Sequence, residues 1–235
     1  MSSVSTRTAV VTGAAGNLGR ALAAGFSALG TRLVMLDRQV DGLRHSLGED
    51  DCKQLIMAVD LLDRHATATA VEKAIAEFGH IDILCNLAGG FRMGEAVHET
   101  TDETWEFLSN INVRTLLNTA RAIVPQMIRQ GGGKIVNVGS AAGHHGVAQM
   151  GAYCAAKSSV IRLTESMAAE LREKGINVNC VLPTIIDTPE NRAAMPHAAF
   201  DRWVPTEALV DVILFLCSPA ARAVHGAALP VSGLS

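Results

Sequence analysis

The sequence has no apolar run long enough to cross a membrane, no cluster of basic residues and no closely spaced cysteine pair. A membrane helix needs about 18 consecutive apolar residues, and the segment Met1 to Thr8 lacks the apolar core of a signal peptide. The 20 basic and 23 acidic residues are balanced and give no footprint for a polyanion such as nucleic acid. These absences predict a soluble, cytoplasmic protein that binds neither a membrane nor nucleic acid.

The cysteines give no sign of disulfides or of a metal site. They are odd in number, widely spaced and mostly placed in apolar segments: Cys52, Cys85, Cys154, Cys180 and Cys217. Because neither a CxxC pair nor a Cys/His cluster is present, no bound metal is expected. The pattern predicts reduced thiols in the core.

Short β-branched runs alternate along the chain with longer segments whose apolar residues recur every three or four positions. The runs predict strands at Thr8–Thr12, Arg32–Asp37, Gln54–Val59, Ile81–Asn86, Lys134–Gly139, Ile176–Leu182 and Ala227–Val231. The longer segments predict helices at Leu18–Leu29, Ala66–Phe78, Glu103–Arg129, Tyr153–Lys174 and Thr206–Cys217. Parallel strands need crossover helices, and strands that are apolar throughout are covered on both faces. The sequence therefore predicts one α/β domain over residues 1–235, with a doubly wound, Rossmann-type and mostly parallel seven-stranded sheet.

A glycine-rich loop connects the first predicted strand directly to a helix. It reads Gly13-Ala14-Ala15-Gly16-Asn17-Leu18-Gly19. Glycines at such a junction let backbone N–H groups and the helix start face a pyrophosphate. The alternative is a tight turn without a ligand, but the position favours nucleotide binding.

Asp37 ends the second predicted strand, 18 residues beyond Gly19. A carboxylate there accepts hydrogen bonds from both hydroxyls of an adenosine ribose and repels a 2′-phosphate. Arg38 acts in the other direction, since its guanidinium can attract that phosphate or lie over the adenine. We expect NAD as the cofactor, with NADP as the alternative.

Tyr153 is the only tyrosine of the chain, and Lys157 follows four residues later on the same face of a predicted helix. A phenol with a pKa near 10 is a poor acid or base at neutral pH, and a nearby ammonium stabilises its phenolate. Ser140 follows the fifth predicted strand, at the sheet edge where doubly wound folds bind ligands. Asn112 lies in the middle of a predicted helix, where an amide needs a specific hydrogen-bonding reason.

Taken together, these motifs resemble the short-chain dehydrogenase/reductase family over nearly the whole chain. The matching elements, in order, are Thr12–Gly19, Asp60, Asn86-Leu87-Ala88-Gly89, Asn112, Ser140, Tyr153-x-x-x-Lys157 and Pro183. Three residues depart from the family pattern, namely Asn17 and Thr184 in place of glycines and Leu87 in place of an asparagine. Asn17 tolerates a positive φ better than other non-glycine residues, so we expect the loop to keep its shape.

The resemblance implies a role for each matching residue. Tyr153 would exchange the substrate proton while hydride passes to or from the nicotinamide, Ser140 would bind the substrate oxygen, Lys157 would hold the nicotinamide ribose, and Asn112 would anchor a proton relay. The cofactor would also contact Gly13, Asn17, Leu18, Gly19, Asp37, Asp60, Leu61, Asn86, Ala88, Gly89, Pro183, Ile186 and Thr188. The family further implies a homodimer or homotetramer built through the Tyr153–Lys174 helix and the long helix before it.

Three loops at the strand ends are expected to select the substrate: Gly89–Glu95, His144–Met150 and the segment 184–205. Their chemically distinctive residues are Phe91, Met93, His144, His145, Met150, Met195 and Trp203. The last segment is similar to dihydropteridine reductases, which lack the family's serine and mid-helix asparagine. Since Ser140 and Asn112 are both present here, a small carbonyl or alcohol substrate is favoured. Dihydropterin reduction is the first alternative, and a non-catalytic NAD-binding sensor or scaffold is the second.

Overall fold

The computed structural model describes residues 6–47 and 50–234, which fold around one sheet of seven strands. The strands are β1 (Thr8–Thr12), β2 (Arg32–Asp37), β3 (Gln54–Ala58), β4 (Ile83–Asn86), β5 (Gly133–Val138), β6 (Ile176–Pro183) and β7 (Ala228–Val231). They lie in the order β3-β2-β1-β4-β5-β6-β7, and every neighbouring pair is parallel. The predicted α/β fold with a seven-stranded parallel sheet is confirmed.

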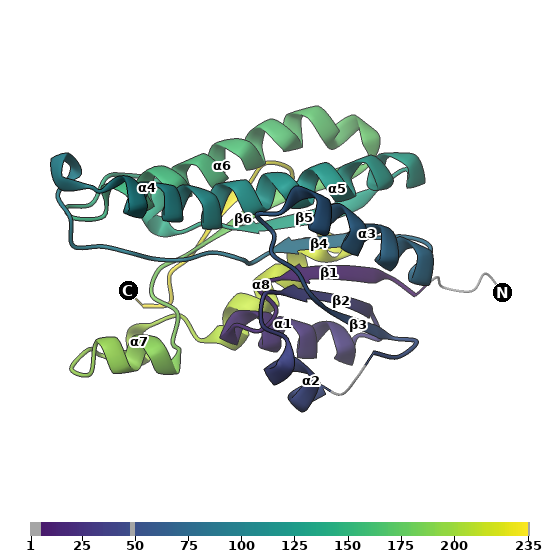
Figure 1. Cartoon of the computed structure of the whole chain (residues 1–235), viewed down its shortest axis with the longest axis horizontal. Coiled ribbons are helices and arrows are strands. Elements are labelled where there is room, and N and C mark those ends of the chain that lie inside the picture. The colour runs from purple at the N-terminus through teal and green to yellow at the C-terminus, as the bar shows by residue number, and fades with distance from the viewer. Residues whose placement is uncertain (1–5, 48–49, 235) are drawn as a thin grey trace.

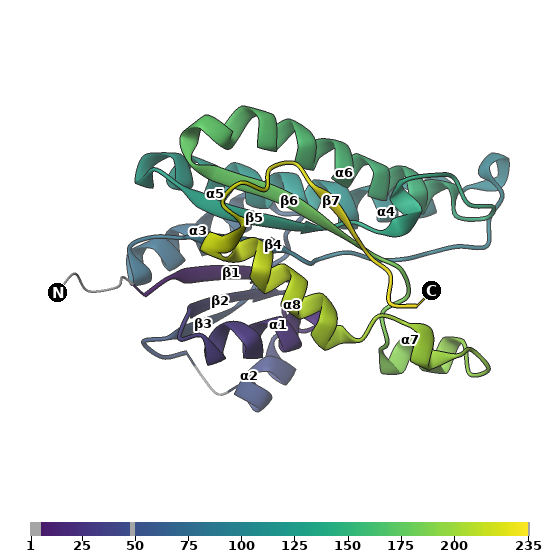
Figure 2. The same ribbon diagram turned by 180° about the vertical axis from the view of Figure 1, so that it is seen from behind.

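Helices cover both faces of this sheet (Figures 1 and 2). One layer holds α1 (Asn17–Ala28), α2 (Asp41–Leu47) and α8 (Thr206–Cys217). The other holds α3 (Arg64–Phe78), α4 (Asp102–Ser109), α5 (Thr115–Gln130) and α6 (Gly151–Leu171). The short helix α7 (Pro189–Ala194) lies beyond the carboxyl ends of the strands.

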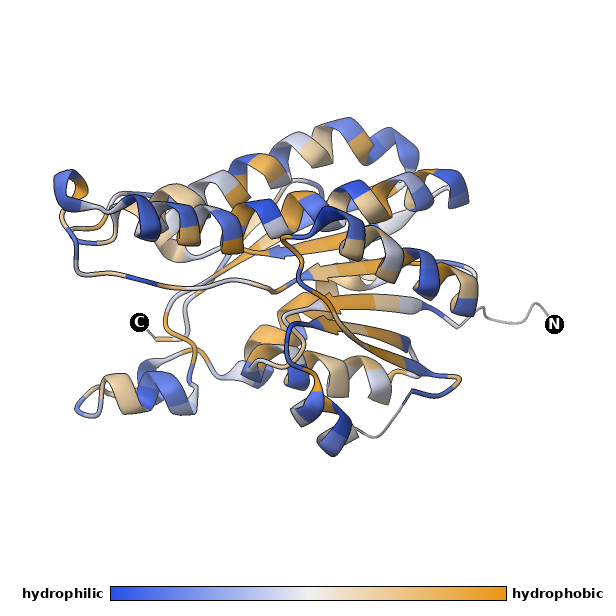
Figure 3. Cartoon of the chain, viewed as in Figure 1, coloured by the Kyte–Doolittle hydropathy of each residue, from blue (hydrophilic) through white to orange (hydrophobic). Residues whose placement is uncertain are grey.

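Alternation along the strands divides the core into two clusters. On β1, Ala9 and Val11 face α1 and α8, where they meet Leu22 and Ile213. Val10, between them, belongs to the cluster that α3, α5 and α6 complete on the opposite face. Both faces of the strands are therefore apolar, and Figure 3 shows the sheet as a hydrophobic band between helices with polar outer surfaces.

The long helix expected at Glu103–Arg129 is not regular. Its middle, Asn110–Arg114, is a π-helical turn that joins α4 to α5. Such turns add a residue to the helix and are often found at functional sites. The prediction was also incomplete, because no helix was expected where α2 lies and the segment that contains α7 was expected to be a loop. The start of α7 does have a recognisable sequence signal that was not used in the prediction. Thr188 caps the helix, and Pro189 follows in its first turn.

A chain of hydrogen-bonded side chains crosses the buried centre of the sheet. Thr119 on α5 donates to Asn86 Oδ1 (2.7 Å), and Asn86 Nδ2 donates to Asn137 Oδ1 (2.9 Å). Asn137 Nδ2 then donates to Thr164 Oγ1 on α6 (2.8 Å). All four residues are buried. This series of hydrogen bonds thus joins β4 and β5 to α5 and α6, the two long helices above them.

We predict that Asn137→Val lowers the free energy of unfolding by about 2 kcal/mol, because it leaves the buried amide of Asn86 without an acceptor. The double variant Asn86→Val/Asn137→Val should cost less than the sum of the two single variants, since it removes both partners. Urea unfolding of the four proteins measures both quantities. Strictly additive costs would show that the two amides do not interact.

Candidate active site

Two cavities open at the edge where the strands end. The first, of about 260 Å³, is lined by residues of the loops after β1, β2, β3 and β4 and by the π-helical segment: Gly13, Gly16, Asp37, Arg38, Val59, Asp60, Leu61, Leu62, Leu87, Ala88, Gly89, Ile111 and Thr115. The second, of about 170 Å³, includes Tyr153 in its wall. The predicted cofactor and catalytic residues therefore meet at one edge of the sheet.

The glycine-rich loop is shaped by two close backbone approaches. Gly13 has a φ of +63°, and a Cβ there would lie 2.8 Å from the backbone nitrogen of Ala88. A Cβ on Gly19 would lie 2.4 Å from the carbonyl oxygen of Gly13. Thr12 fixes the facing turn, because its Oγ1 accepts hydrogen bonds from the N–H groups of Leu87 (3.1 Å) and Ala88 (3.2 Å). Only glycine therefore fits at position 13 without moving this turn, and only glycine fits at position 19 without moving Gly13 and Ala14.

Asn17 keeps the loop intact for a reason other than the expected one. Within the described chain, Gln149 is the one non-glycine residue with a positive φ, so Asn17 makes no use of its tolerance for that conformation. Asn17 is instead the first residue of α1, and its Nδ2 donates to Glu190 Oε2 on α7 at 2.6 Å. No side chain caps this helix start, so its first N–H groups can face an anion.

Asp37 and Arg38 stand together at the first cavity, as the sequence predicted. Asp37 Oδ2 accepts a hydrogen bond from Ala15 N–H at 2.9 Å, which ties the end of β2 to the glycine-rich loop. Asp60 and Leu61 line the same cavity from the loop after β3. A carboxylate and a guanidinium thus both face the space where an adenosine ribose is expected.

Other expected cofactor residues lie elsewhere at this edge. The side chain of Asn86 points into the core as part of the buried hydrogen-bonded chain, so only the turn after it reaches the cavity. Pro183 ends β6, Ile186 forms a bridge with Val204, and Thr188 caps α7. None of these three lines either of the two cavities.

Tyr153, Ser140 and Lys157 come together between β5 and α6. Burial raises the pKa of the Tyr153 phenol, and a hydrogen bond with the Ser140 side chain partly offsets this rise. Burial lowers the pKa of Lys157 to about 8. The Lys157 ammonium lies 5.9 Å from the centre of the Tyr153 ring and donates to the carbonyl oxygen of Val138 at 3.0 Å. The tyrosine is therefore protonated at neutral pH in the free protein.

Asn112 braces the turn that faces these groups. From the π-helical turn, its Nδ2 donates to the carbonyl oxygens of Gly90 and Leu108, each at 3.0 Å. Its Oδ1 accepts the N–H of Gly90 at 3.2 Å. A Cβ on Gly89 would lie 2.9 Å from Asn112 Oδ1 and 3.4 Å from Lys157 Nζ. The structure thus places Asn112, Lys157 and the turn after β4 side by side.

The second cavity is more polar than expected. Its walls are formed by Arg92, Met93, Glu95, Thr100, Thr104, Leu108, Gln149, Met150, Gly151, Ala152 and Tyr153. Met93 and Met150 were named from the sequence, and the predicted Phe91 contacts Tyr153 edge to face at 4.8 Å. The sequence did not predict that α4 contributes to this wall. The Thr104 hydroxyl of α4 donates to Glu95 Oε1 at 3.0 Å, and no local sequence signal links these two residues.

Three of the residues named in the substrate loops lie outside the second cavity. His144 and His145 are exposed and do not line the second cavity. Trp203 is buried, with 5% of its surface exposed, and packs against Phe200 in the segment that follows α7. Its indole therefore stabilises the fold of that segment and lines neither of the two cavities.

All five cysteines are free thiols, and all but Cys52, which is exposed, are buried. Among residues 6–47 and 50–234, no group of three or more His, Cys, Asp or Glu side chains could hold a metal ion. No helix of the described ranges combines the length and the apolar character that a membrane crossing requires.

The chain is similar in sequence and in structure to known dehydrogenases and reductases. Residues 7–198 match the family model described as short chain dehydrogenase. The chain is 32% identical to D-threitol dehydrogenase of Mycolicibacterium smegmatis, over 97% of this chain and 92% of that protein. It is 37% identical to sorbitol dehydrogenase of Cereibacter sphaeroides, over 77% and 71%. The 3-ketoacyl-(acyl-carrier-protein) reductase of Brucella melitensis, solved with NADH, superposes with a TM-score of 0.86 at 28% identity, over 97% of each chain.

Burial of the Lys157 ammonium predicts a pH-dependent cost to stability. Its pKa is about 8 in the folded protein and near 10.4 in an unfolded chain, so unfolding takes up a proton between these values and stability rises with pH there. We expect Lys157→Met to raise the Tm of the cofactor-free protein by roughly 5 °C at pH 7, and by less as the pH approaches 10.5. The exposed Lys73→Met is the control and should show no such trend. A constant difference at every pH would contradict the assignment.

Proposed function

The chain belongs to the short-chain dehydrogenase family, and we propose that it transfers hydride between a nicotinamide coenzyme and a small carbonyl or alcohol substrate. The observation that carries this proposal is the meeting of Tyr153, Ser140 and Lys157 beside the second cavity. A phenol, a hydroxyl and a buried ammonium form a proton donor, a second hydrogen-bond donor and a charge that stabilises the phenolate.

The first cavity fits the adenosine half of such a coenzyme. Side chains are absent at Gly13 and Gly16, the start of α1 carries free N–H groups, and Asp37 stands where a ribose needs acceptors. NADH is bound by the Brucella melitensis reductase, and carveol dehydrogenase of Mycobacterium avium, at 27% identity, was solved with NAD. We propose NAD as the preferred coenzyme, with NADP the alternative that Arg38 would favour.

When bound, the nicotinamide supplies or accepts the hydride, and the chain's own residues manage the proton. In reduction, the Tyr153 phenol donates its proton to the carbonyl oxygen while the Ser140 hydroxyl donates a hydrogen bond to the same oxygen. In oxidation, Tyr153 would first release its proton to solvent, and its phenolate would then accept the hydroxyl proton of the alcohol as the hydride leaves. Lys157 then stabilises the phenolate, and Asn112 keeps Gly89 and Gly90 in place beside Lys157.

The second cavity supports a small polyhydroxylated substrate. Arg92, Glu95, Thr104 and Gln149 place charged and hydrogen-bonding groups in its wall, next to the apolar Met93 and Met150. A small cavity with several polar groups suits a short polyol or ketose. Two of the relatives named above are polyol dehydrogenases, which agrees with this choice. The homodimer or homotetramer expected from the family remains a prediction.

The coenzyme preference rests on Asp37. We predict that the protein binds NADH more tightly than NADPH and that Asp37→Ala narrows the difference by about tenfold, because the variant no longer repels a 2′-phosphate. Arg38→Ala is the matched variant on the neighbouring position and should weaken NADPH binding selectively. Fluorescence titration of both coenzymes gives the dissociation constants. Tighter binding of NADPH by the unmodified protein would show that Arg38 decides the preference.

The reaction type rests on Ser140. If the substrate is a carbonyl, Ser140→Ala should lower turnover roughly a hundred- to thousandfold, the usual cost of one lost donor to a developing oxyanion. Affinity for NADH should stay nearly the same, because Ser140 holds substrate and not coenzyme. Turnover is measured with the best substrate from a screen of polyols, ketones, aldehydes, oxoacyl thioesters and a quinonoid dihydropterin.

Ser159→Ala serves as the control for the Ser140 variant. Ser159 lies on α6 and donates to the backbone oxygen of Ala155, so the change should leave turnover intact. Full activity of Ser140→Ala would reject the carbonyl reading and favour dihydropterin reduction, which develops little negative charge on oxygen. Coenzyme binding without turnover on any substrate would favour the sensor or scaffold.

A further inference from the structure

The opposite edge of the sheet carries a hollow of about 430 Å³ that the proposed reaction does not use. It forms where the strands begin, between the residues that precede or start β1, β4, β5, β6 and β7. We call it the basic hollow, and it is lined by Arg7, Asp82, Gly132, Gly133, Lys134, Arg172, Gly175, Asn177, Arg222 and His225. Because all strands are parallel, it lies a full strand length from the glycine-rich loop.

Four cations face one carboxylate in the basic hollow. The cations are Arg7, Lys134, Arg172 and Arg222, and the carboxylate is Asp82. This excess of positive charge is local, since the whole chain has a formal net charge of −3. A concave surface with charges of one sign focuses its field and attracts counter-ions. The lining thus has the electrostatic character of an anion site.

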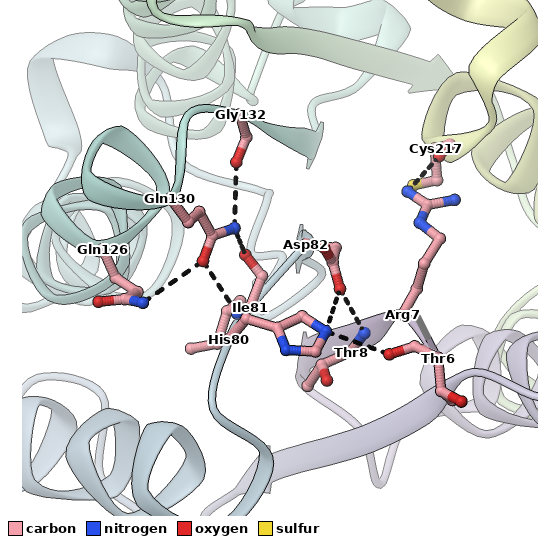
Figure 4. A network of polar contacts seen from close by, with 10 residues as sticks. All are labelled: Thr6, Arg7, Thr8, His80, Ile81, Asp82, Gln126, Gln130, Gly132 and Cys217. Carbon is pink, nitrogen blue, oxygen red and sulfur yellow. Dashed lines mark hydrogen bonds and ion pairs between the residues drawn. The ribbon is translucent and has the colours of Figure 1, made fainter. Parts of the chain in front are cut away.

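The carboxylate of Asp82 does not neutralise these cations. Figure 4 shows Asp82 turned toward His80 and the N–H of Thr8, at 3.2 and 2.7 Å, while Arg7 reaches away to the backbone oxygen of Cys217. Within residues 6–47 and 50–234, none of the four cations has a carboxylate within 4.0 Å. No carboxylate therefore neutralises their charges, and Arg172 and Arg222 are exposed toward a ligand.

The basic hollow is held in shape by buried contacts. Lys134 Nζ donates to Asn177 Oδ1 at 2.6 Å, and Asn177 Nδ2 donates to the backbone oxygens of Arg222 (3.0 Å) and Val224 (2.9 Å). Asn177 is only 5% exposed, so it fixes the loop before β7 against β6. Burial, and then the charge of Arg7, lower the pKa of Lys134. The site therefore exists before any ligand arrives, and an anion would relieve the repulsion within it.

We propose that the basic hollow binds a compact polyphosphate anion at a site separate from the proposed active site. Several cations around a space larger than one phosphate group favour a multivalent anion over a single charge. Arg172 and Arg222 are exposed at its rim and contribute guanidinium groups suited to phosphate oxygens. The polyphosphate can be free or part of a nucleotide, because both present the same oxygens.

The test is calorimetric titration with inorganic pyrophosphate, at an ionic strength held constant with sodium chloride. We expect saturable binding that Arg172→Gln/Arg222→Gln weakens at least about tenfold, since two charge-assisted contacts are lost. These two side chains are exposed and form no ion pair with the described residues, so the variant should fold normally. The control Lys53→Gln/Lys73→Gln removes two exposed cations elsewhere and should change the affinity less than about twofold.

Amide NMR locates the bound anion independently of any activity. Pyrophosphate should shift the signals of Gly132, Gly133 and Gly175 and leave those of Gly13 and Gly16 unchanged. Titration with tripolyphosphate and with ATP distinguishes a free polyphosphate from a nucleotide. Tighter binding of ATP than of tripolyphosphate would identify a nucleotide as the ligand. Unchanged affinity in the arginine variant, shifts confined to the glycine-rich loop, or no binding beyond the effect of chloride would each overturn the proposal.

Discussion

Parallel pairing on both sides of β1 is the constraint from which the rest of the molecule follows. With β2 on one side and β4 on the other, every strand must return through a helix on one face or the other. All strands then end at one edge, where Asp37, the turn after Asn86 and Ser140 meet although they are far apart in sequence. All strands begin at the other edge, which gathers Arg7, Lys134, Arg172 and Arg222 in the same way. One topology thus creates two edges of different chemistry.

At the active-site edge, close approaches of backbone matter as much as side chains. Thr12 holds the turn after β4 against the glycine-rich loop, and a Cβ on Gly13 would strike that turn. The same turn continues to Gly89 and Gly90, which lie against Asn112 and Lys157. The turn after β4 therefore contacts the glycine-rich loop at one end and the side chains of Asn112 and Lys157 at the other. A Cβ on Gly89 would crowd the side chains of Asn112 and Lys157, and one on Gly90 would crowd Phe107 and Ile111.

The strands and most helices could be predicted because their signals are local. Alternation and β-branched runs mark β1 to β7 within one or two residues, and the Tyr153-x-x-x-Lys157 spacing places the two proposed catalytic groups on one helix face. Other features depend on contacts between distant segments. Asn112 in the π-helical turn donates to the carbonyl oxygen of Gly90 in the turn after β4. Thr104 of α4 donates to Glu95 in the loop before it. The basic hollow is invisible in sequence, because each of its cations is isolated there and the total charge is balanced.

Two locally unfavourable features lie at or near the second cavity. Gln149, the one described non-glycine residue with a positive φ, lies in its wall, and the buried Lys157 stands behind it. Burial raises the pKa of Tyr153 and lowers that of Lys157, so each charged form is disfavoured alone. The two charged forms are less unfavourable when they occur together, because a phenolate and a nearby ammonium stabilise each other. In the proposed reaction, loss of the tyrosine proton is therefore favoured only while Lys157 keeps its own, so the proposed roles of the two groups depend on each other.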